Sequence, residues 1–175
     1  MELTVAARLL EGGIEQTHTR QVWADFGSGK GLFTEALSTL LPEQSKIYAI
    51  DKDGGALHGI ESKRKNISIE KVRKDFVHDK LDIELLDGII MANALHFVEN
   101  KVVFMNTVRC MLKPAAHVIL IEYDTDHSNP WVPYPISFHS LIGLVKEIGF
   151  SEVIKLDEEP SIYERANMYS ALMKI

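Results

Sequence analysis

The sequence predicts an α/β fold in which helices cover both faces of a mostly parallel sheet of seven strands. Short runs rich in β-branched and aromatic residues alternate with segments whose apolar residues recur at helical spacing. A glycine-rich turn joins the first strand to its helix, and the last two strands lie close enough in the chain for an antiparallel hairpin. Because 175 residues, 46% of them apolar, can bury one substantial core, we expect a single domain over residues 1–175.

The first expected elements are separated by glycine and proline. A short helix over residues 3–10 forms most of an N-terminal helical segment, residues 1–20, and paired glycines follow it. Apolar residues recur at helical spacing over 32–41 until Pro42, whose ring cannot continue a helix. A further helix is expected over 98–112. Parallel strands are expected at residues 21–26, 46–50, 67–72, 87–92 and 117–123.

The C-terminal part combines a capped helix with the hairpin. Ser137 has the side chain of an N-cap, and the helix that follows is expected to run to Ile148 and to stop at Gly149. The two strands of the hairpin are expected at residues 152–157 and 168–174, on either side of an acidic turn around Pro160.

Charge and cysteine content exclude several classes of protein. A net charge of −6 and a pI near 5.6 give no general attraction to phosphate backbones, which disfavours nucleic acid as a partner. The single cysteine, Cys110, cannot form an internal disulfide, and its apolar neighbours predict a packed thiol, not a nucleophile. No stretch approaches about 18 uninterrupted apolar residues, so we expect a cytoplasmic protein with no membrane partner.

The glycine-rich turn GSGKG fails to match two phosphate-binding motifs. A Walker-type loop starts with glycine and ends in Gly-Lys-Ser or Gly-Lys-Thr, whereas this chain has Ala24 at the start and Gly31 after Lys30. A dinucleotide fingerprint needs a third glycine where this chain has Leu32. The spacing is GxGxG instead, with Asp25 two residues before the first glycine.

Carboxylates near the ends of the first two strands favour a nucleoside with a positively charged tail. Gly27 and Gly29 carry no side chains and let a ligand approach the backbone. Asp25 would repel a pyrophosphate but would accept hydrogen bonds from an ammonium group. Asp51, at the end of the second strand, can accept both hydroxyls of a ribose. A nucleoside with an amino-acid tail fits both carboxylates.

Five segments in order resemble the motifs of the class I S-adenosylmethionine-dependent methyltransferases, of the methyltransferase domain 11 or 25 type. They are VWADFGSGKG, IYAID, VRKDF, LLDGIIMANALHFVEN and MLKPAAHVILIEY, and the C-terminal segment is similar to the family's antiparallel hairpin. The resemblance runs from about residue 20 to the C-terminus. It implies a Rossmann-like sheet of strand order 3-2-1-4-5-7-6, with strand 7 antiparallel, and S-adenosyl-L-methionine as the cofactor.

The resemblance also assigns parts of the cofactor to individual residues. Asp25 and the glycine backbone would hold the methionine portion, and Asp51 the ribose. Asp75 would bond the exocyclic amino group of adenine, the Phe76 amide a ring nitrogen, and Asn93 would border the sulfonium. As alternatives, Asp75 is a surface charge and Asn93 caps a turn. The expected cofactor-binding residues are Asp25, Gly27, Ser28, Gly29, Gly31, Asp51, Lys52, Asp75, Phe76 and Asn93.

One segment departs from the family pattern. The chain has KPAAH before the fifth strand, where the family usually has KPGG. Because Ala115 and Ala116 lack the freedom of glycine at positive φ, we expect a reshaped turn there.

Methyl transfer from a sulfonium needs mainly in-line alignment, so the sequence leaves the catalytic residue open. Possible bases near the ends of the fourth and fifth strands are His96, Glu122, Asp124, Asp126 and His127. Of these, His96, His127 and Asp124 are weak catalytic candidates, because His96 can equally pack beside the cofactor and His127 can be solvated. The loop over 124–136 could line the substrate pocket with Trp131, Pro133, Tyr134 and Pro135. No spacing of ligands indicates a metal.

The acceptor is narrowed by elimination. The segment ANALHF lacks the Asn-Pro-Pro-Tyr-like run of adenine amino methyltransferases, and Cys110 lies too far along the chain for cytosine-carbon methylation. We therefore expect a small-molecule acceptor, with a protein acceptor left open. Two other classes also stay open: a non-catalytic methyltransferase-like scaffold, and a nicotinamide oxidoreductase, against which Leu32 and the C-terminal hairpin argue.

Overall fold

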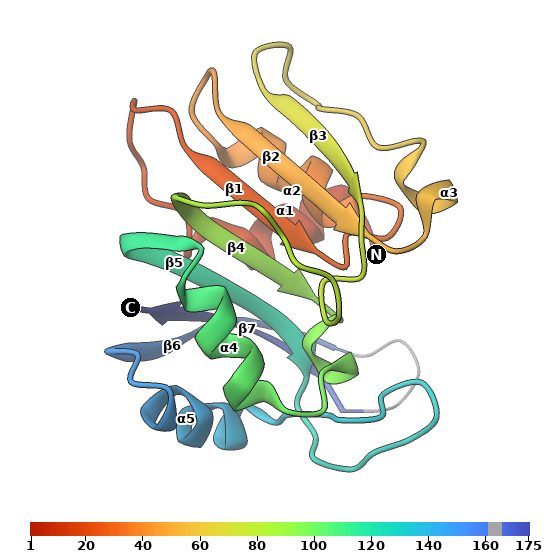
Figure 1. The fold of residues 1–175 in the computed structure, drawn as a ribbon, viewed down its shortest axis with the longest axis vertical. Coiled ribbons are helices and arrows are strands. Elements are labelled where there is room, and N and C mark those ends of the chain that lie inside the picture. The colour runs from red at the N-terminus through yellow and green to blue at the C-terminus, as the bar shows by residue number, and fades with distance from the viewer. Residues whose placement is uncertain (161–165) are drawn as a thin grey trace.

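A computed structural model describes residues 1–160 and 166–175, and its strands form one seven-stranded sheet, β3-β2-β1-β4-β5-β7-β6 (Figure 1). Strand β7 runs antiparallel to β5 and β6, whereas the pairs among β1 to β5 are parallel. The predicted fold class and strand order are confirmed. The strands are β1 (Val22–Phe26), β2 (Lys46–Asp51), β3 (Ser68–Arg73), β4 (Leu86–Ala92), β5 (Leu112–Tyr123), β6 (Glu152–Glu159) and β7 (Met168–Lys174).

Helices pack on both faces of the sheet. In Figure 1, α1 and α2 lie behind it, and α4 and α5 lie in front. Each face has its own apolar cluster, with Trp23 and Leu37 in one and Phe104 and Leu141 in the other. The helices are α1 (Leu3–Glu11), α2 (Leu32–Leu40), α3 (Gly54–Leu57), the 3₁₀ turn η1 (Leu95–Phe97), α4 (Lys101–Arg109) and α5 (Phe138–Glu147).

The predicted cap of α5 is confirmed in detail. Ser137 Oγ accepts a hydrogen bond from the Ser140 amide at 3.1 Å. At the other end, Gly149 has φ +72°, a left-handed conformation that ends helices and that glycine adopts without strain. Likewise α2 ends at Leu40, two residues before Pro42.

The predicted helix over 98–112 is wrong in its bounds and in its placement of Cys110. The 3₁₀ turn η1 precedes the segment, and within it only the shorter α4 is helical; Asn100 caps α4 by accepting the Val103 amide at 3.0 Å. Cys110 follows the last residue of α4 and is exposed, because the side of the helix that carries Phe104 and Val108 faces the core. The expectation of a packed thiol is therefore corrected.

Strand β5 begins at Leu112, five residues before its predicted start. Leu112 pairs with Leu86, and the register then shifts so that Gly88 pairs with His117, which makes a bulge of the residues between. Ala115 adopts φ +63° in this bulge, contrary to the expectation that alanine would not, at a strain of about 1 kcal/mol.

Two further points complete the comparison with the sequence. The short α3 was not predicted, because a single turn has no periodicity. The Asp53 side chain caps it by accepting hydrogen bonds from the amides of Gly55 and Ala56. Part of the hairpin turn, residues 161–165, lies outside the described residues. Within the described ranges, no helix is long and apolar enough to cross a membrane.

Candidate functional site

The glycine-rich loop turns the chain from the end of β1 into α2. The amides of Gly27 and Ser28 both donate to the carbonyl of Ile50 in the neighbouring β2, at 2.9 and 3.0 Å. Gly27 has φ +75°, and a Cβ there would lie 2.9 Å from the Cβ of Ala94. Gly29 has φ +52°, with no atom within 4 Å of the position of a Cβ. The loop therefore presents bare backbone beside open space.

Asp51 lies at the end of β2 with its carboxylate held by two backbone amides. Its Oδ2 accepts from Gly29 and its Oδ1 accepts from Asp53, both at 2.8 Å. These bonds orient the side chain and leave a lone pair on each oxygen, because a carboxylate oxygen can accept two hydrogen bonds. The half-buried group can accept two further donors, as a ribose would supply.

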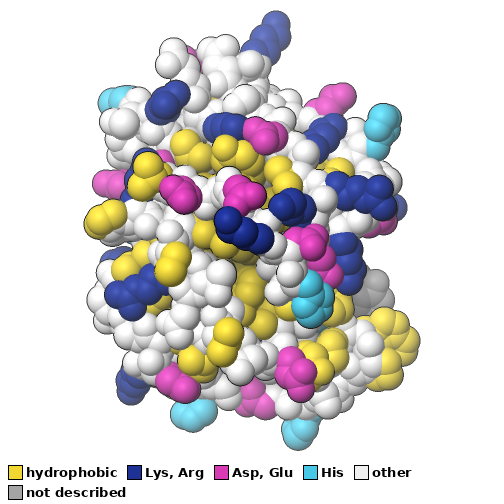
Figure 2. Space-filling view, viewed as in Figure 1, with side chains coloured by type: hydrophobic (Ala, Val, Ile, Leu, Met, Phe, Trp, Pro, Cys, Tyr) yellow, Lys and Arg dark blue, Asp and Glu magenta, His cyan; other side chains and the backbone are white. Residues whose placement is uncertain are grey.

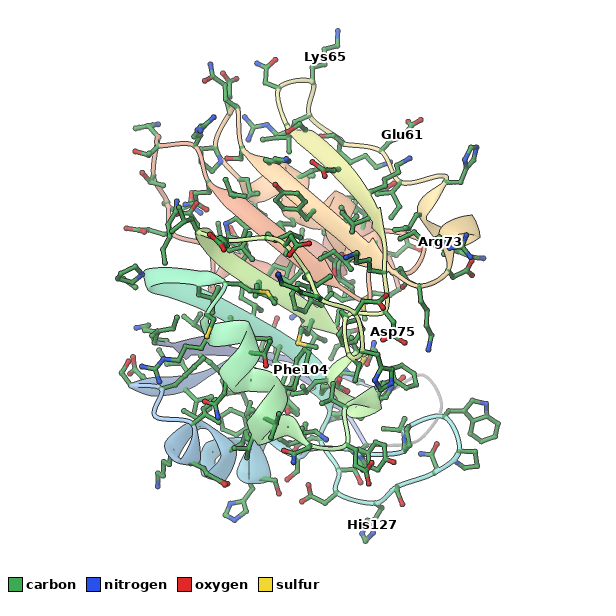
Figure 3. The ribbon with its side chains drawn as sticks, viewed as in Figure 1. Glu61, Lys65, Arg73, Asp75, Phe104 and His127 are labelled. Carbon is green, nitrogen blue, oxygen red and sulfur yellow. The ribbon has the colours of Figure 1, made fainter. Side chains whose placement is uncertain are left out.

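Six of the ten predicted cofactor residues line one cavity of about 280 Å³. The cavity lies where the carboxyl ends of β1, β2 and β4 meet the segment after β3, and Figure 3 shows Asp75 on that segment. The other four, Asp25, Ser28, Gly29 and Gly31, belong to β1 and the loop. The lining residues are Gly27, Asp51, Lys52, Asp75, Phe76, Val77, Asn93, Ala94 and Phe97.

Asp75 and Phe76 form one wall of this cavity. Asp75 Oδ1 accepts the Val77 amide at 3.0 Å, and its Oδ2 lies 3.9 Å from Lys52 Nζ. The Phe76 ring packs against those of Phe26 and Phe104, with both centroid distances 5.8 Å. The Phe76 amide makes no hydrogen bond within the described part of the chain, so it can donate to a ligand.

Two buried side-chain atoms near the loop lack hydrogen-bond partners. They are Ser28 Oγ and Asn93 Oδ1, and among the described residues no other buried side-chain nitrogen or oxygen is in this state. Asn93 has φ +52° and directs its Nδ2 to the sulfur of Met168 at 3.8 Å. Because buried polar atoms are nearly always bonded, unpartnered ones at a cavity indicate a place for polar ligand atoms.

Asp25 lies in the interior and not among the residues that line the cavity. It is 1% exposed and accepts a hydrogen bond from Thr34 Oγ1 at 2.5 Å. Burial raises the pKa of its carboxyl to about 7, because removal from water disfavours the charged form; the Thr34 bond opposes this and the charge of Asp51 adds to it.

A second cavity, of about 640 Å³, adjoins the first at Asn93, which lines both. The loop over 124–136, which Figure 1 shows extending from the carboxyl end of β5, forms its outer part. Of the predicted aromatic wall, Trp131 lines this cavity, whereas Tyr134 lines a separate one beside α4. The residues around the second cavity are Asn93, His96, Tyr123, Thr125, His127, Asn129, Trp131, Val132 and Ala166.

The three catalytic candidates have different surroundings. His96 is buried, and its Nδ1 lies 2.7 Å from Glu122 Oε2. Asp124 accepts the Phe138 amide at 2.8 Å and so binds the loop to the start of α5. His127 is exposed at the edge of the second cavity, and in Figure 3 its side chain points away from the sheet.

Asp126 also makes structural hydrogen bonds. Its carboxylate accepts the amide and hydroxyl of Ser137 and the hydroxyl of Ser140, at 2.8 to 3.0 Å. These bonds stabilise the charged form and lower the pKa of Asp126. Asp126 therefore fixes the loop on α5.

Fold and site together define a Rossmann-like domain with a cavity at the carboxyl ends of β1 and β2, the place where open α/β sheets bind their ligands. The family model described as a methyltransferase domain matches residues 24–120, more than half of the 175, and the chain belongs to this family. Its cofactor is S-adenosylmethionine. No curated protein sequence matches the chain.

Solved structures of methyltransferases share the fold. One from Leishmania major is 17% identical, with a TM-score of 0.74 over 97% of this chain and 72% of that chain. The plantazolicin methyltransferase BpumL, solved with SAH, is 13% identical, with a TM-score of 0.67 over 98% of this chain and 83% of that one. The CurJ carbon methyltransferase is 17% identical, with a TM-score of 0.69 over 99% of this chain and 58% of that one.

Proposed function

We propose that this methyltransferase transfers the methyl group of S-adenosylmethionine to a small-molecule acceptor held in the 640 Å³ cavity. We call this the acceptor cavity, and the 280 Å³ cavity the cofactor cavity. The observation that carries the proposal is the position of Asn93, which lines both cavities. An acceptor in the larger cavity would meet the smaller one at that residue. Residues 1–175 would form a single catalytic domain.

The residues of the smaller cavity fit the cofactor. Asp51 would accept the ribose hydroxyls, while Asp75 and the free Phe76 amide would hold adenine. The loop backbone, with the unpartnered Ser28 Oγ, would hold the methionine portion. Lys52, beside Asp75, and Gly31, at the start of α2, would complete the site. When bound, the cofactor supplies a methyl group that its sulfonium activates for in-line displacement.

Asp25 would act from behind the loop. Its carboxyl is buried and, with a pKa of about 7, is about half protonated at neutral pH. A nearby ammonium group would favour the ionised form. Asn93, with its free Oδ1, would border the transferred methyl.

The lining of the larger cavity supports a small acceptor. Its aromatic and apolar members are Tyr123, Trp131 and Val132, and its polar members include Thr125 and Asn129. A concave site with mostly apolar walls and a few polar groups is typical of small-molecule binding. Two of the structural relatives are a plantazolicin methyltransferase and a carbon methyltransferase, which is consistent with an acceptor of this kind.

Cofactor binding is tested by calorimetry on Asp51→Asn, with Asp53→Asn as the matched control. Loss of a charge-assisted hydrogen bond of about 1.5–3 kcal/mol should weaken S-adenosylmethionine binding by roughly 10- to 100-fold. Asp53, two residues away, caps α3 and does not line the cavity, and asparagine is an equally good cap. We expect the control to bind as the unaltered protein does, and NAD not to bind.

Methyl transfer is tested separately with methyl-labelled S-adenosylmethionine and a cell extract. We expect the label to appear in the small-molecule fraction, and to be lost with Asp51→Asn at low cofactor concentration. Label in the protein fraction would point to a protein acceptor. Tight cofactor binding with no labelled product would contradict the proposal and favour a non-catalytic scaffold.

A further inference from the structure

His96 and Glu122 form a buried pair at the carboxyl ends of β4 and β5. The side chains are 4% and 1% exposed. Glu122 uses both oxygens on one residue: Oε2 lies 2.7 Å from Nδ1 of His96, and Oε1 accepts the His96 backbone amide at 3.1 Å. With Glu122 as a carboxylate, which only accepts hydrogen bonds, Nδ1 is the donor of this contact and the lone pair of the ring lies on Nε2.

Nε2 is the atom of this pair that remains available. It makes no hydrogen bond within the described residues, and His96 lines the acceptor cavity next to Asn93. A histidine that lines a substrate cavity, with one nitrogen oriented by a carboxylate and the other without a partner, has the arrangement of a general base.

The lining of the acceptor cavity restricts the charge of the acceptor. Apart from the two histidines, the described residues that line it include no Lys, Arg, Asp or Glu. Among these described residues, no guanidinium or ammonium is present to hold a carboxylate or phosphate, and no carboxylate to hold an ammonium. Tyr123 and Trp131 provide aromatic surface instead.

We propose that the acceptor is a neutral molecule with a weakly acidic hydroxyl on an unsaturated carbon, a phenol or an enol, and that His96 Nε2 removes its proton. This rests on the proposed function of the cavity. A neutral amine attacks with its own lone pair and needs no base before transfer, whereas a hydroxyl must lose its proton. The buried pair therefore assists a hydroxyl acceptor and gives no advantage to an amine.

Charge and atoms balance over the step. Nε2 takes the proton of the acceptor, whose electron pair, on oxygen or on the conjugated carbon, forms the bond to the methyl carbon. The methyl carbon–sulfur bond breaks and sulfur keeps its electron pair. His96 becomes an imidazolium that the Glu122 carboxylate stabilises, and the proton then passes to solvent.

The test uses three probes of one shape: 2-naphthol, the more acidic 6-cyano-2-naphthol, and 2-naphthylamine. We expect methyl transfer to both naphthols, and we expect any transfer to the amine to be unaffected by His96→Asn, because the amine needs no base before transfer. His96→Asn should slow transfer to 2-naphthol by about 100-fold or more, the usual contribution of a general base. At a pH where 6-cyano-2-naphthol is already ionised, the loss should stay below about 10-fold, because no proton remains to be removed.

Controls separate this role from a structural one. Glu122→Gln should show the same selective loss with a smaller size, and exposed His18→Asn should leave both rates unchanged. Calorimetry should give unaltered S-adenosylmethionine binding for all three variants. Equal losses on both naphthols would mean that the pair only supports the fold. Faster transfer to the amine than to 2-naphthol, or transfer to none of the probes while the extract is labelled, would overturn the acceptor class, and an unlabelled extract would overturn the proposed function with it.

Discussion

The buried carboxyl of Asp25 should make the stability of this protein depend on pH in a defined direction. Its pKa is about 7 in the folded protein and 3.8 when exposed, so between these values the folded state binds a proton that the unfolded state lacks. The stabilisation by this proton is full below about pH 4 and is lost as the pH rises through 7. Three pH units correspond to about 4 kcal/mol, of which about 3 kcal/mol falls between pH 5 and pH 8.

Asp25→Asn isolates this contribution. Asparagine has the same shape, does not ionise, and can accept the bond from Thr34 Oγ1 through its amide oxygen. Urea unfolding from pH 5 to pH 8 should show the variant gaining about 3 kcal/mol relative to the unaltered protein as the pH rises. The exposed Asp82→Asn should run nearly parallel to the unaltered protein. Parallel curves for Asp25→Asn would refute the reasoning.

The same variant reports on the cofactor. If an ammonium group approaches Asp25 on binding, the carboxyl should ionise and release a proton at pH 6. Calorimetry in buffers of different ionisation enthalpy measures this release, and Asp25→Asn should abolish the part that Asp25 contributes. An unchanged proton count would limit Asp25 to supporting the loop.

Three further substitutions test the packing around the site. Gly27→Ala places a Cβ 2.9 Å from that of Ala94 at φ +75°, and should lower stability by roughly 1–2 kcal/mol, measured by urea unfolding, and weaken cofactor binding. Phe76→Ala removes a half-buried ring that packs on two others, and should lose roughly 2 kcal/mol; an unchanged urea midpoint would contradict the packing. Tyr169→Phe removes the buried hydroxyl that donates to the Ile136 carbonyl at 3.0 Å, and should lower the Tm by about 2–4 °C in calorimetry.

The position of the 280 Å³ cavity could be predicted from sequence because its main parts lie on one βαβ unit. The strand, the glycine turn, the helix and the next strand follow one another, so Gly27 and Asp51 must meet at one edge of the sheet. The spacing of the residues could not show which side chains point into the core and which line the cavity. Asp25 points into the core toward Thr34 and not into the cavity, and no local pattern distinguishes these two directions for a residue so near the end of a strand.

Local irregularities could not be predicted from the sequence for a different reason. The positive φ of Ala115 accompanies the pairing of Leu112 with Leu86, which brings the residues before the predicted start at 117 into β5. Residue preference alone argues against that conformation, and tertiary pairing overrides it at about 1 kcal/mol. Cys110 is exposed because α4 ends at Arg109, one residue before it. The apolar residues around Cys110 in the sequence do not show where the helix ends.

The contact between His96 and Glu122 can be inferred once the order of the strands is known. Both were candidates individually, but they are 26 residues apart, and nothing in their spacing indicates contact. Contact follows once β4 is known to pair with β5 in register, because Ala92 lies opposite Ile121 and the 3₁₀ turn after β4 then brings the histidine over the next residue of β5. A strand order correctly predicted from sequence therefore contains the information to predict side-chain pairs of this kind, provided that candidate residues are compared across neighbouring strand ends and not only along the chain.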